Sequence, residues 1–285
     1  MQHISRFVLH FCLIALSLLC IIPLVIVVSA SLSDETALVR QGYALWPRSF
    51  SLEAYQFILN NPSQILSAYK VSLLVTVVGT IASLLITSLM AYPISRREFR
   101  LKSPIAFYVF FTMLFNGGLV PTYIVVTQTL QLKDSLLALI LPYLIIPFNV
   151  LLVRTFFSQL PEEIIESAKV DGLNDYGILF RIVLPLSKPV LATVGLMCSL
   201  GYWNDWWLAL LYINDRELFP LQFLLQNIMS NIQVMATIPG LSTANIPSET
   251  ARMAMGVLAI GPIIFVYLFF QKYFVRGLTV GAIKG

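Results

Sequence analysis

Residues 71–92 read VSLLVTVVGTIASLLITSLMAY, an apolar run without one charged side chain. A helix of about 20 such residues crosses the roughly 30 Å hydrocarbon core of a lipid bilayer. In lipid, only helices and closed barrels satisfy all of their own backbone hydrogen bonds, and the short alternating strands typical of a barrel do not occur in this sequence. The run is therefore predicted to be a transmembrane helix.

Five other stretches of the 285-residue chain have the same character. The six predicted spans are Phe7–Ala30, Val71–Tyr92, Pro104–Leu130, Ser135–Val153, Pro189–Ile213 and Met253–Phe274. The chain is 58% hydrophobic and only 11% charged, whereas a soluble domain carries about 25% charged residues. This composition predicts an all-α, polytopic membrane protein with one transmembrane domain over residues 1–285. It excludes an aqueous enzyme, a secreted disulfide scaffold and a disordered chain.

The first span has features of a secretory signal, because Arg6 precedes it and Val28-Ser29-Ala30 resembles a cleavage site. The apolar core of a signal peptide covers about 7–15 residues, and this run is clearly longer. The length favours an uncleaved membrane anchor.

Basic residues predict the orientation, since cytoplasmic loops are enriched in Lys and Arg. With the N-terminus inside, twelve of the 18 Lys and Arg residues fall in cytoplasmic segments. Both termini are therefore expected in the cytoplasm. Of the three long connections, 31–70 and 214–252 then lie outside, and 154–188 lies inside.

The cytoplasmic loop 154–188 has the pattern of two short helices. Pro161 with Glu162 and Glu163 is typical of a helix start, where carboxylates suit the positive end of the dipole. Gly172 is expected to end this helix. A second helix is expected over Tyr176–Val183, stopping at Leu184-Pro185. An ordinary pair of amphipathic helices on the membrane surface is the alternative.

The spacing within this loop resembles the Glu-Ala-Ala loop of ABC importer permeases. That pattern is Glu-Ala-Ala, three residues, Gly, nine residues, Ile, one residue and Leu-Pro. The matching positions are Glu166, Ser167, Ala168, Gly172, Ile182, Leu184 and Pro185. Ser167 replaces the middle Ala, a small change. The resemblance is to the carbohydrate-uptake group of binding-protein-dependent permeases, similar to the maltose-type second subunit and closer to oligosaccharide permeases.

Other stretches carry the same resemblance across most of the chain. They are Leu45-Trp46-Pro47, the segment from Asn116 to Tyr123, the segment from Trp203 to Trp207, and the tail Gly277–Gly285. In relatives such a tail can reach toward the ATPase, and the resemblance extends that role here.

The resemblance implies a type I ABC importer permease fold in a bacterial cytoplasmic membrane. The loop would be a coupling helix that docks in a cleft of an ATPase subunit, with Glu163 and Asp171 beside the matched positions. The implied partners are two ATP-binding subunits, a second permease subunit of different sequence and an extracytoplasmic sugar-binding protein. The sequence contains no Gly-Lys dipeptide and so no Walker-type phosphate loop. The chain is thus expected to be a transport subunit without cofactor or metal, with ATP and Mg²⁺ on the partner ATPase.

Two polar places within the spans are candidates for the substrate pathway. In the third span, Asn116, Gly117 and Gly118 and then Pro121 are expected to interrupt the helix, ahead of Tyr123. Broken backbone at that depth lines a cavity or is covered by protein. A helix kink without a functional role explains this stretch equally well.

The second candidate place is at the outer end of the fifth span. Asn204 and Asp205 can hydrogen-bond to sugar hydroxyls, while Trp203 or Trp206 can stack on a pyranose ring. An aromatic belt at the membrane interface is the alternative.

An ion-coupled secondary transporter is the other function considered. Such proteins carry ionisable residues midway through their spans, but Asp205 is the one acidic residue in the six predicted spans and lies off-centre. An intramembrane enzyme is excluded because the two histidines, His3 and His10, are both at the N-terminus and no nucleophile–base cluster exists.

Overall fold

A computed structural model describes residues 2–60, 62–237 and 247–264. In these ranges the chain is mostly helical, and its one pairing of extended segments is an isolated bridge between Ser33 and Phe50. The described residues form two compact units. The first comprises those within 1–66 and 224–262, and the second those within 67–223 and 263–264.

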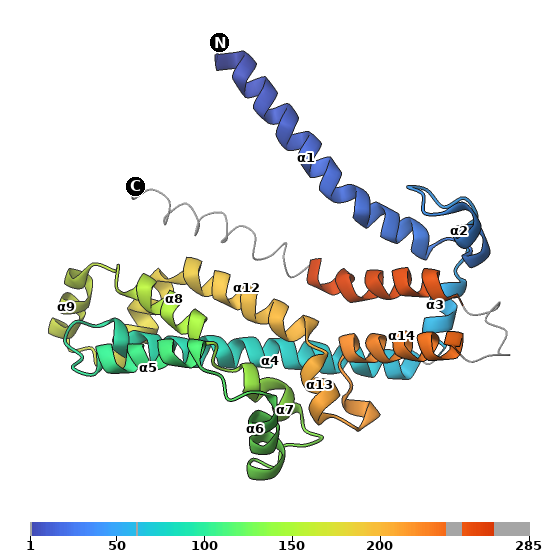
Figure 1. The fold of residues 1–285 in the computed structure, drawn as a ribbon. Coiled ribbons are helices and arrows are strands. Elements are labelled where there is room, and N and C mark those ends of the chain that lie inside the picture. Colours follow the sequence, from blue (N-terminus) through green and yellow to red (C-terminus); the bar gives the residue numbers. More distant parts are fainter. Residues whose placement is uncertain (1, 61, 238–246, 265–285) are drawn as a thin grey trace. The chain divides into compact units, whose positions relative to one another are not determined.

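Among the described residues, the first unit contains three complete helices and most of two others. They are α1 (Gln2–Ser31), α2 (Glu35–Gln41), α3 (Glu53–Ile58), most of α14 (Leu221–Thr237), and most of a helix over 248–264 (Figure 1). Asp34 begins α2 by accepting the Ala37 N–H at 2.9 Å, and Gly42 with φ +75° ends it. This is the sequence signature of a short capped helix.

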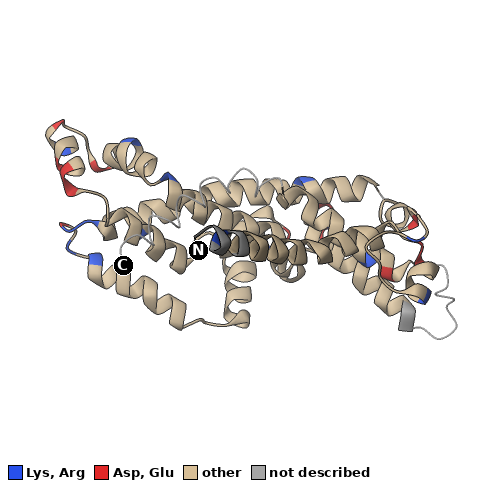
Figure 2. Cartoon of the chain, turned by 90° about the horizontal axis from the view of Figure 1, so that it is seen from above, with Lys and Arg blue, Asp and Glu red and all other residues tan. Residues whose placement is uncertain are grey.

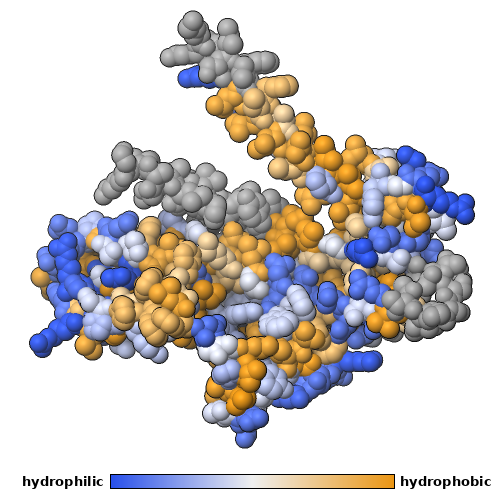
Figure 3. Space-filling model, viewed as in Figure 1, coloured by the Kyte–Doolittle hydropathy of each residue, from blue (hydrophilic) through white to orange (hydrophobic). Residues whose placement is uncertain are grey.

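Helix α1 is apolar on all sides. Its Leu9–Ser31 part is strongly apolar, and the most apolar stretch within it is not buried against other described residues. Figure 3 shows a hydrophobic surface along most of its length. The first predicted span is confirmed as a long helix that continues through Val28-Ser29-Ala30. A helix with such a surface is suited to lipid or to another subunit.

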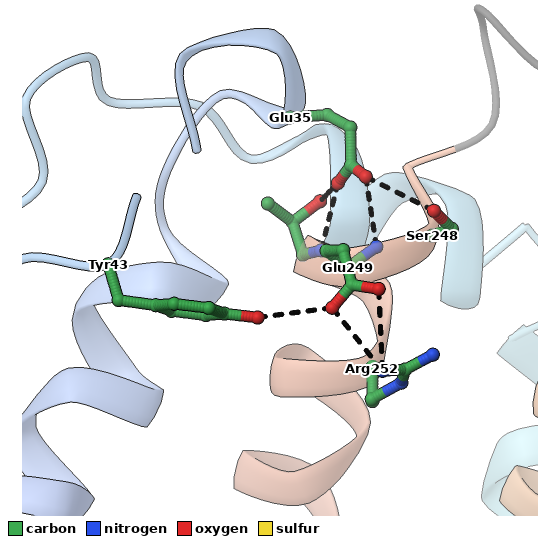
Figure 4. Close-up of polar contacts among 6 residues, drawn as sticks. Glu35, Tyr43, Ser248, Glu249 and Arg252 are labelled. Atoms are coloured by element: carbon green, nitrogen blue, oxygen red, sulfur yellow. Dashed lines mark hydrogen bonds and ion pairs between the residues drawn. The ribbon is translucent and has the colours of Figure 1, made fainter. Parts of the chain in front are cut away.

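A carboxylate from a distant segment caps the helix over 248–264 (Figure 4). One oxygen of Glu35 accepts hydrogen bonds from the Glu249 N–H at 2.9 Å and the Ser248 hydroxyl at 3.2 Å. The other oxygen accepts from the Thr250 N–H at 2.9 Å and the Thr250 hydroxyl at 2.7 Å. Free N–H groups at a helix start need acceptors. Glu35 therefore ties the segment after α1 to the start of the last described helix.

Next to this cap, Glu249 connects two exposed side chains. Its carboxylate accepts a hydrogen bond from the Tyr43 hydroxyl at 3.1 Å and forms an ion pair with Arg252 at 3.3 Å (Figure 4). The pKa of Tyr43 is raised, first by partial burial and then by its bond to Glu249.

The second unit holds the remaining helices. They are α4 (Pro62–Ser95, except its first turn), α5 (Lys102–Leu114), α6 (Leu119–Ile124), the π-helix η1 (Val125–Thr129), α7 (Leu136–Ile140), the 3-10 helix η2 (Leu141–Tyr143), α8 (Pro147–Phe157), α9 (Glu162–Val170), α10 (Asp175–Ile178), the π-helix η3 (Leu179–Val183), α11 (Leu184–Leu186), α12 (Lys188–Asn204), α13 (Trp207–Tyr212) and the 3-10 helix η4 (Arg216–Leu218). Helices α4, α5, α8 and α12 all contribute buried side chains to one core cluster (Figure 1).

The core of this unit supports the loop 154–188. Val150, Val153 and Phe157 of α8 are fully buried in one cluster with Ile178 and Val183 of the loop. Burial of side chains of this size contributes roughly 1.5–3 kcal/mol each. The second half of the loop is thus anchored on the helix bundle.

The third predicted span is broken where the sequence predicted. Helix α5 ends at Leu114, α6 begins at Leu119, and the two halves are bent by 111°. Gly118 has φ +88°, a conformation that favours glycine. Pro121 is part of α6, in its first turn, where a missing N–H is tolerated. The break itself thus depends on the residues up to Gly118.

The fourth and fifth predicted spans are not continuous helices in the structure. The fourth bends by 52° between Tyr143 and Pro147, because the residue before a proline is driven out of the helical conformation. The fifth ends at Asn204, and α13 begins at Trp207. Asp205 lies between them in an extended conformation and accepts the Leu208 N–H at 3.1 Å, so it caps α13.

In the described residues, two helices are long and apolar enough to cross a membrane, α1 and α4. Counting each bent pair as one span raises the number to five. The predicted sixth span, Met253–Phe274, starts in the helix over 248–264 and extends beyond the described residues.

Candidate functional site

Helix α9 presents a charged outer face and an apolar inner face. Pro161 precedes it, and the carboxylates of Glu162 and Glu163 lie in its first turn, where the helix dipole favours negative charge. Ile165 and Ala168 are buried in the core cluster of the second unit. This packing leaves the opposite face of α9 exposed.

The predicted coupling residues fall on both faces. Glu163, Glu166 and Ser167 are exposed, whereas Ala168 is only 3% exposed. The small side chain of Ala168 therefore lets α9 approach its own core. The exposed carboxylates remain available to a partner.

Gly172 ends α9 as predicted. It has φ +81°, in the left-handed region that favours glycine. The Leu173 N–H donates to the Ala168 carbonyl at 3.0 Å and the Gly172 N–H to the Lys169 carbonyl at 3.0 Å. These bonds close the helix in a Schellman-like turn, with Asp171 exposed at its end.

The second predicted loop helix is longer than expected. It begins at Asp175, where the Asn174 side chain caps it by accepting the Gly177 N–H at 2.8 Å, and continues to Leu186. The predicted stop at Pro185 was wrong. The π-helical turn before Pro185 is the kind of local adjustment by which a helix accommodates proline. Ile182 and Leu184 are half-buried, and Pro185 is exposed.

Two ion pairs join α9 to the turn over 96–101, which follows α4. Arg97 lies 3.1 Å from Glu162, and Lys169 lies 2.5 Å from Glu98. The hydrogen bond from Lys169 holds the pKa of Glu98 below its usual range, and Glu98 raises the pKa of Lys169. A contact that lowers a carboxyl pKa is present at neutral pH and is lost as the pH falls through the lowered value.

The sequence alone did not predict these two ion pairs. The signal for them was the charged run Arg96, Arg97, Glu98, Arg100 and Lys102, which served only to predict orientation. Figure 2 shows charged residues of both signs gathered around α9 and this turn, while the helices leading away are mostly uncharged. Exposed pairs contribute about 0–1 kcal/mol each, so they orient α9 more than they stabilise it.

The fifth-span candidates are split by the break. Asn204 and Asp205 line a cavity of about 260 Å³ together with Tyr143, whose hydroxyl donates to Asp205 at 3.0 Å. Trp203 is 3% exposed, whereas Trp206 is 37% exposed. Trp206 is therefore partly accessible at the surface of the second unit, whereas Trp203 is not.

The third-span candidates lie elsewhere in the second unit. Asn116, Gly117 and Gly118 are exposed, and the Asn116 side chain accepts the Gly118 N–H at 2.8 Å. Tyr123 stacks on Tyr212 of α13, with ring centroids 5.8 Å apart. None of these third-span candidates lines the cavity at Asp205. The described residues hold no cluster of three or more His, Cys, Asp or Glu side chains suited to a metal.

Residues 83–280 match the model of a family described as the binding-protein-dependent transport system inner membrane component. This chain belongs to that family. It is 42% identical to the polygalacturonan/rhamnogalacturonan transport system permease protein YtcP of Bacillus subtilis over 96% of both chains. It is 29% identical to the trehalose/maltose transport system permease protein MalG of Thermococcus litoralis, over 99% of this chain and 98% of that one.

A solved structure is similar over almost the whole chain. It is a bacterial ABC transporter involved in the import of the acidic polysaccharide alginate, with a TM-score of 0.79 and 29% identity. The match covers 95% of this chain and 97% of the other.

Family membership confirms the function class predicted from the loop. The chain is a multi-pass inner-membrane component and the transmembrane subunit of an ABC importer, which is a transport component and not an enzyme. An ATPase and a substrate-binding protein are its partners. The ion-coupled alternative is therefore dropped. The tail Gly277–Gly285 and part of the connection over 214–252 lie outside the described residues.

Proposed function

We propose that this chain is one half of a permease that imports acidic oligosaccharides across a bacterial cytoplasmic membrane. It would form a single domain of six spans over residues 1–285, with both termini in the cytoplasm. Its complex would hold a second, non-identical permease subunit and two ATPase subunits. ATP and Mg²⁺ would bind only to the ATPases, and the binding protein would dock outside.

The observation that carries the substrate class is the 42% identity, over 96% of both chains, to a permease named for polygalacturonan and rhamnogalacturonan. The similar solved structure concerns another acidic polysaccharide.

The site for energy coupling would be the exposed face of α9. Glu163 and Glu166 would meet basic groups of the ATPase, with Ser167, Asp171 and Gly172 at the same surface. The inner side of the loop is packed into the same core as α8. Movement of the ATPase would therefore be passed to the helix bundle as a rigid displacement, which switches access between the two sides of the membrane. Ile182, Leu184 and Pro185 would form the second half of this lever.

Uptake measurements test the substrate class. Membrane vesicles with the complete complex and its binding protein are expected to import labelled oligogalacturonides. Unlabelled oligogalacturonides should compete, whereas neutral maltooligosaccharides should not. Import of the neutral sugars alone would contradict the proposed substrate while leaving the transport role intact.

The cavity at Asp205 would be part of the sugar pathway. We expect Asp205→Asn to lower uptake about tenfold without loss of the ATPase from the complex, because a carboxylate accepts stronger hydrogen bonds from sugar hydroxyls than an amide does. Initial uptake rates of the purified complex in liposomes measure this.

Tyr143→Phe is the matched control, since it removes the hydroxyl that bonds to Asp205 and keeps the carboxylate. It is expected to leave uptake within about twofold, because the carboxylate that would meet the sugar stays in place. An equal loss in both variants would mean that Asp205 serves the bend between α12 and α13 and does not touch sugar.

A further inference from the structure

A second cavity lies in the unit that carries α9, at the end of a membrane span. Its volume is about 640 Å³, within the range typical of small-molecule sites. Leu89, Tyr92 and Pro93 come from the last turns of α4, and Arg96, Glu98 and Phe99 from the turn after it. The opposite wall is formed by Lys169, Asp175, Tyr176 and Leu179.

Tyr92 carries a polar atom that lacks a partner. Its side chain lines the cavity and is 94% buried (6% exposed), and its hydroxyl has no hydrogen-bond partner among the described residues. Buried hydroxyls are almost always paired, because an unmade hydrogen bond in the interior is costly. The Arg96 guanidinium lies over the ring of Tyr92, 5.4 Å from its centroid. The hydroxyl is itself closed to solvent, so a ligand would reach it only after a small rotation of the Tyr92 side chain. A ligand that accepts a hydrogen bond and carries negative charge would then satisfy both Tyr92 and Arg96.

The other charges of the cavity call for a positive group as well. Arg96 donates through Nε to Ser95 and through Nη2 to the Phe157 carbonyl, and its Nη1 has no partner among the described residues and could meet a ligand. Lys169 is engaged by Glu98. The Asp175 carboxylate adds a second negative charge to the lining. Lys169 and Glu98 compensate each other, so Arg96 and Asp175 remain as one cation and one carboxylate, which complement a zwitterion better than a simple anion.

The position of the cavity favours a lipid as its ligand. Leu89 and Pro93 belong to a helix that is long and apolar enough to span the membrane, and Arg96 follows directly after its end. The lining therefore changes from apolar to charged over a few residues, as a bilayer does at its headgroups.

We propose that this cavity binds a zwitterionic phospholipid with a primary ammonium group, of the phosphatidylethanolamine class. The phosphate would lie at Arg96 and the Tyr92 hydroxyl, the ammonium at Asp175, and the start of the acyl chains against Leu89 and Pro93. This lipid would belong to the cytoplasmic leaflet, an assignment that rests on the proposed orientation of the chain. A lipid bound here would join the end of α4 to α9 and α10, beside the coupling face.

Native mass spectrometry of the whole complex tests this. The complex is taken from nanodiscs with equal amounts of phosphatidylethanolamine, phosphatidylcholine and phosphatidylglycerol, and retained lipids are counted. We expect one retained phosphatidylethanolamine per copy of this chain. Choline has no N–H to donate to the Asp175 carboxylate, and glycerol has no positive charge. Tyr92→Phe should reduce retention roughly 2- to 10-fold, the effect of one hydrogen bond.

Tyr108→Phe is the matched control, because Tyr108 is an exposed tyrosine of α5 outside the cavity. It should retain lipid as the unchanged chain does. The complexes with the unchanged chain, with Tyr92→Phe and with Tyr108→Phe should all unfold at the same temperature. Equal retention of the three lipids, no retention, or full retention by Tyr92→Phe would overturn the proposal.

Two further measurements distinguish a lipid from other occupants of the cavity. An excess of soluble phosphoethanolamine should not displace the lipid, since the apolar wall also holds it; displacement would overturn the lipid assignment. Retention only after the ATPase is removed would mean that the ATPase fills the cavity, which also overturns it. The ATPase itself is visible in the same spectra, so failure of the proposed function is scored separately.

Discussion

Glu166→Lys is expected to abolish association of the ATPase while the chain still inserts into the membrane. Glu166 is exposed on the outer face of α9 and forms no hydrogen bond or ion pair within the described part of the chain. The substitution should therefore leave the fold intact. At the proposed interface it replaces an attraction to basic groups with a repulsion, which costs several kcal/mol. Co-purification of the ATPase with the tagged chain measures the effect.

Glu217→Lys provides the matched control. It makes the same change of charge at an exposed position in η4, which is predicted to lie on the other side of the membrane. The ATPase should co-purify with this variant in normal amounts. Normal recovery with Glu166→Lys as well would show that α9 is not the docking element.

Glu35→Ala is expected to lower the stability of the first unit by about 2–4 kcal/mol. The change removes all four hydrogen bonds to Ser248, Glu249 and Thr250. It leaves free N–H groups at a helix start and, because Thr250 is only 1% exposed, a buried hydroxyl without an acceptor. Bonds to a charged group contribute about 1.5–3 kcal/mol each, but a shared cap is not additive. The unfolding temperature of the purified complex should fall by several degrees.

Two other variants should destabilise the complex less than Glu35→Ala does. Glu35→Gln keeps one acceptor oxygen and should show an intermediate loss. Glu249→Ala removes only the exposed contacts to Tyr43 and Arg252, which contribute about 0–1 kcal/mol. If Glu249→Ala destabilises the complex as much as Glu35→Ala, the cap is not what holds the helix start.

Much of the fold was predictable because lipid places simple demands on a sequence. Long uncharged runs identified α1 and α4, and the glycines at 117 and 118 identified the break after α5. The bends at Pro147 and Asp205 were not predicted, although each has a local cause. Proline restricts the residue before it, and an aspartate can cap a new helix as readily as it can line a pathway. A break of two or three residues hardly changes the average hydropathy of a stretch of about 20 residues, so hydropathy alone does not reveal it.

The candidate site was predictable where the spacing along the chain decides it. The end of α9 at Gly172 follows from local turn chemistry. The pairing of α9 with Arg97 and Glu98 was not predictable, because those residues are more than 60 positions distant along the chain. The division of the motif into a packed face with Ala168 and an exposed face with Glu166 also needed the core cluster to be known. The Glu35 cap is likewise a contact between distant segments.

The central claim is that this chain works in an importer driven by ATP. Oligosaccharide uptake into sealed vesicles that contain the complete complex, measured with and without ATP, tests it most directly. We predict that uptake stops when ATP is withdrawn and persists when ionophores abolish the proton and sodium gradients. Uptake that continues without ATP and collapses with the ionophores would contradict the account.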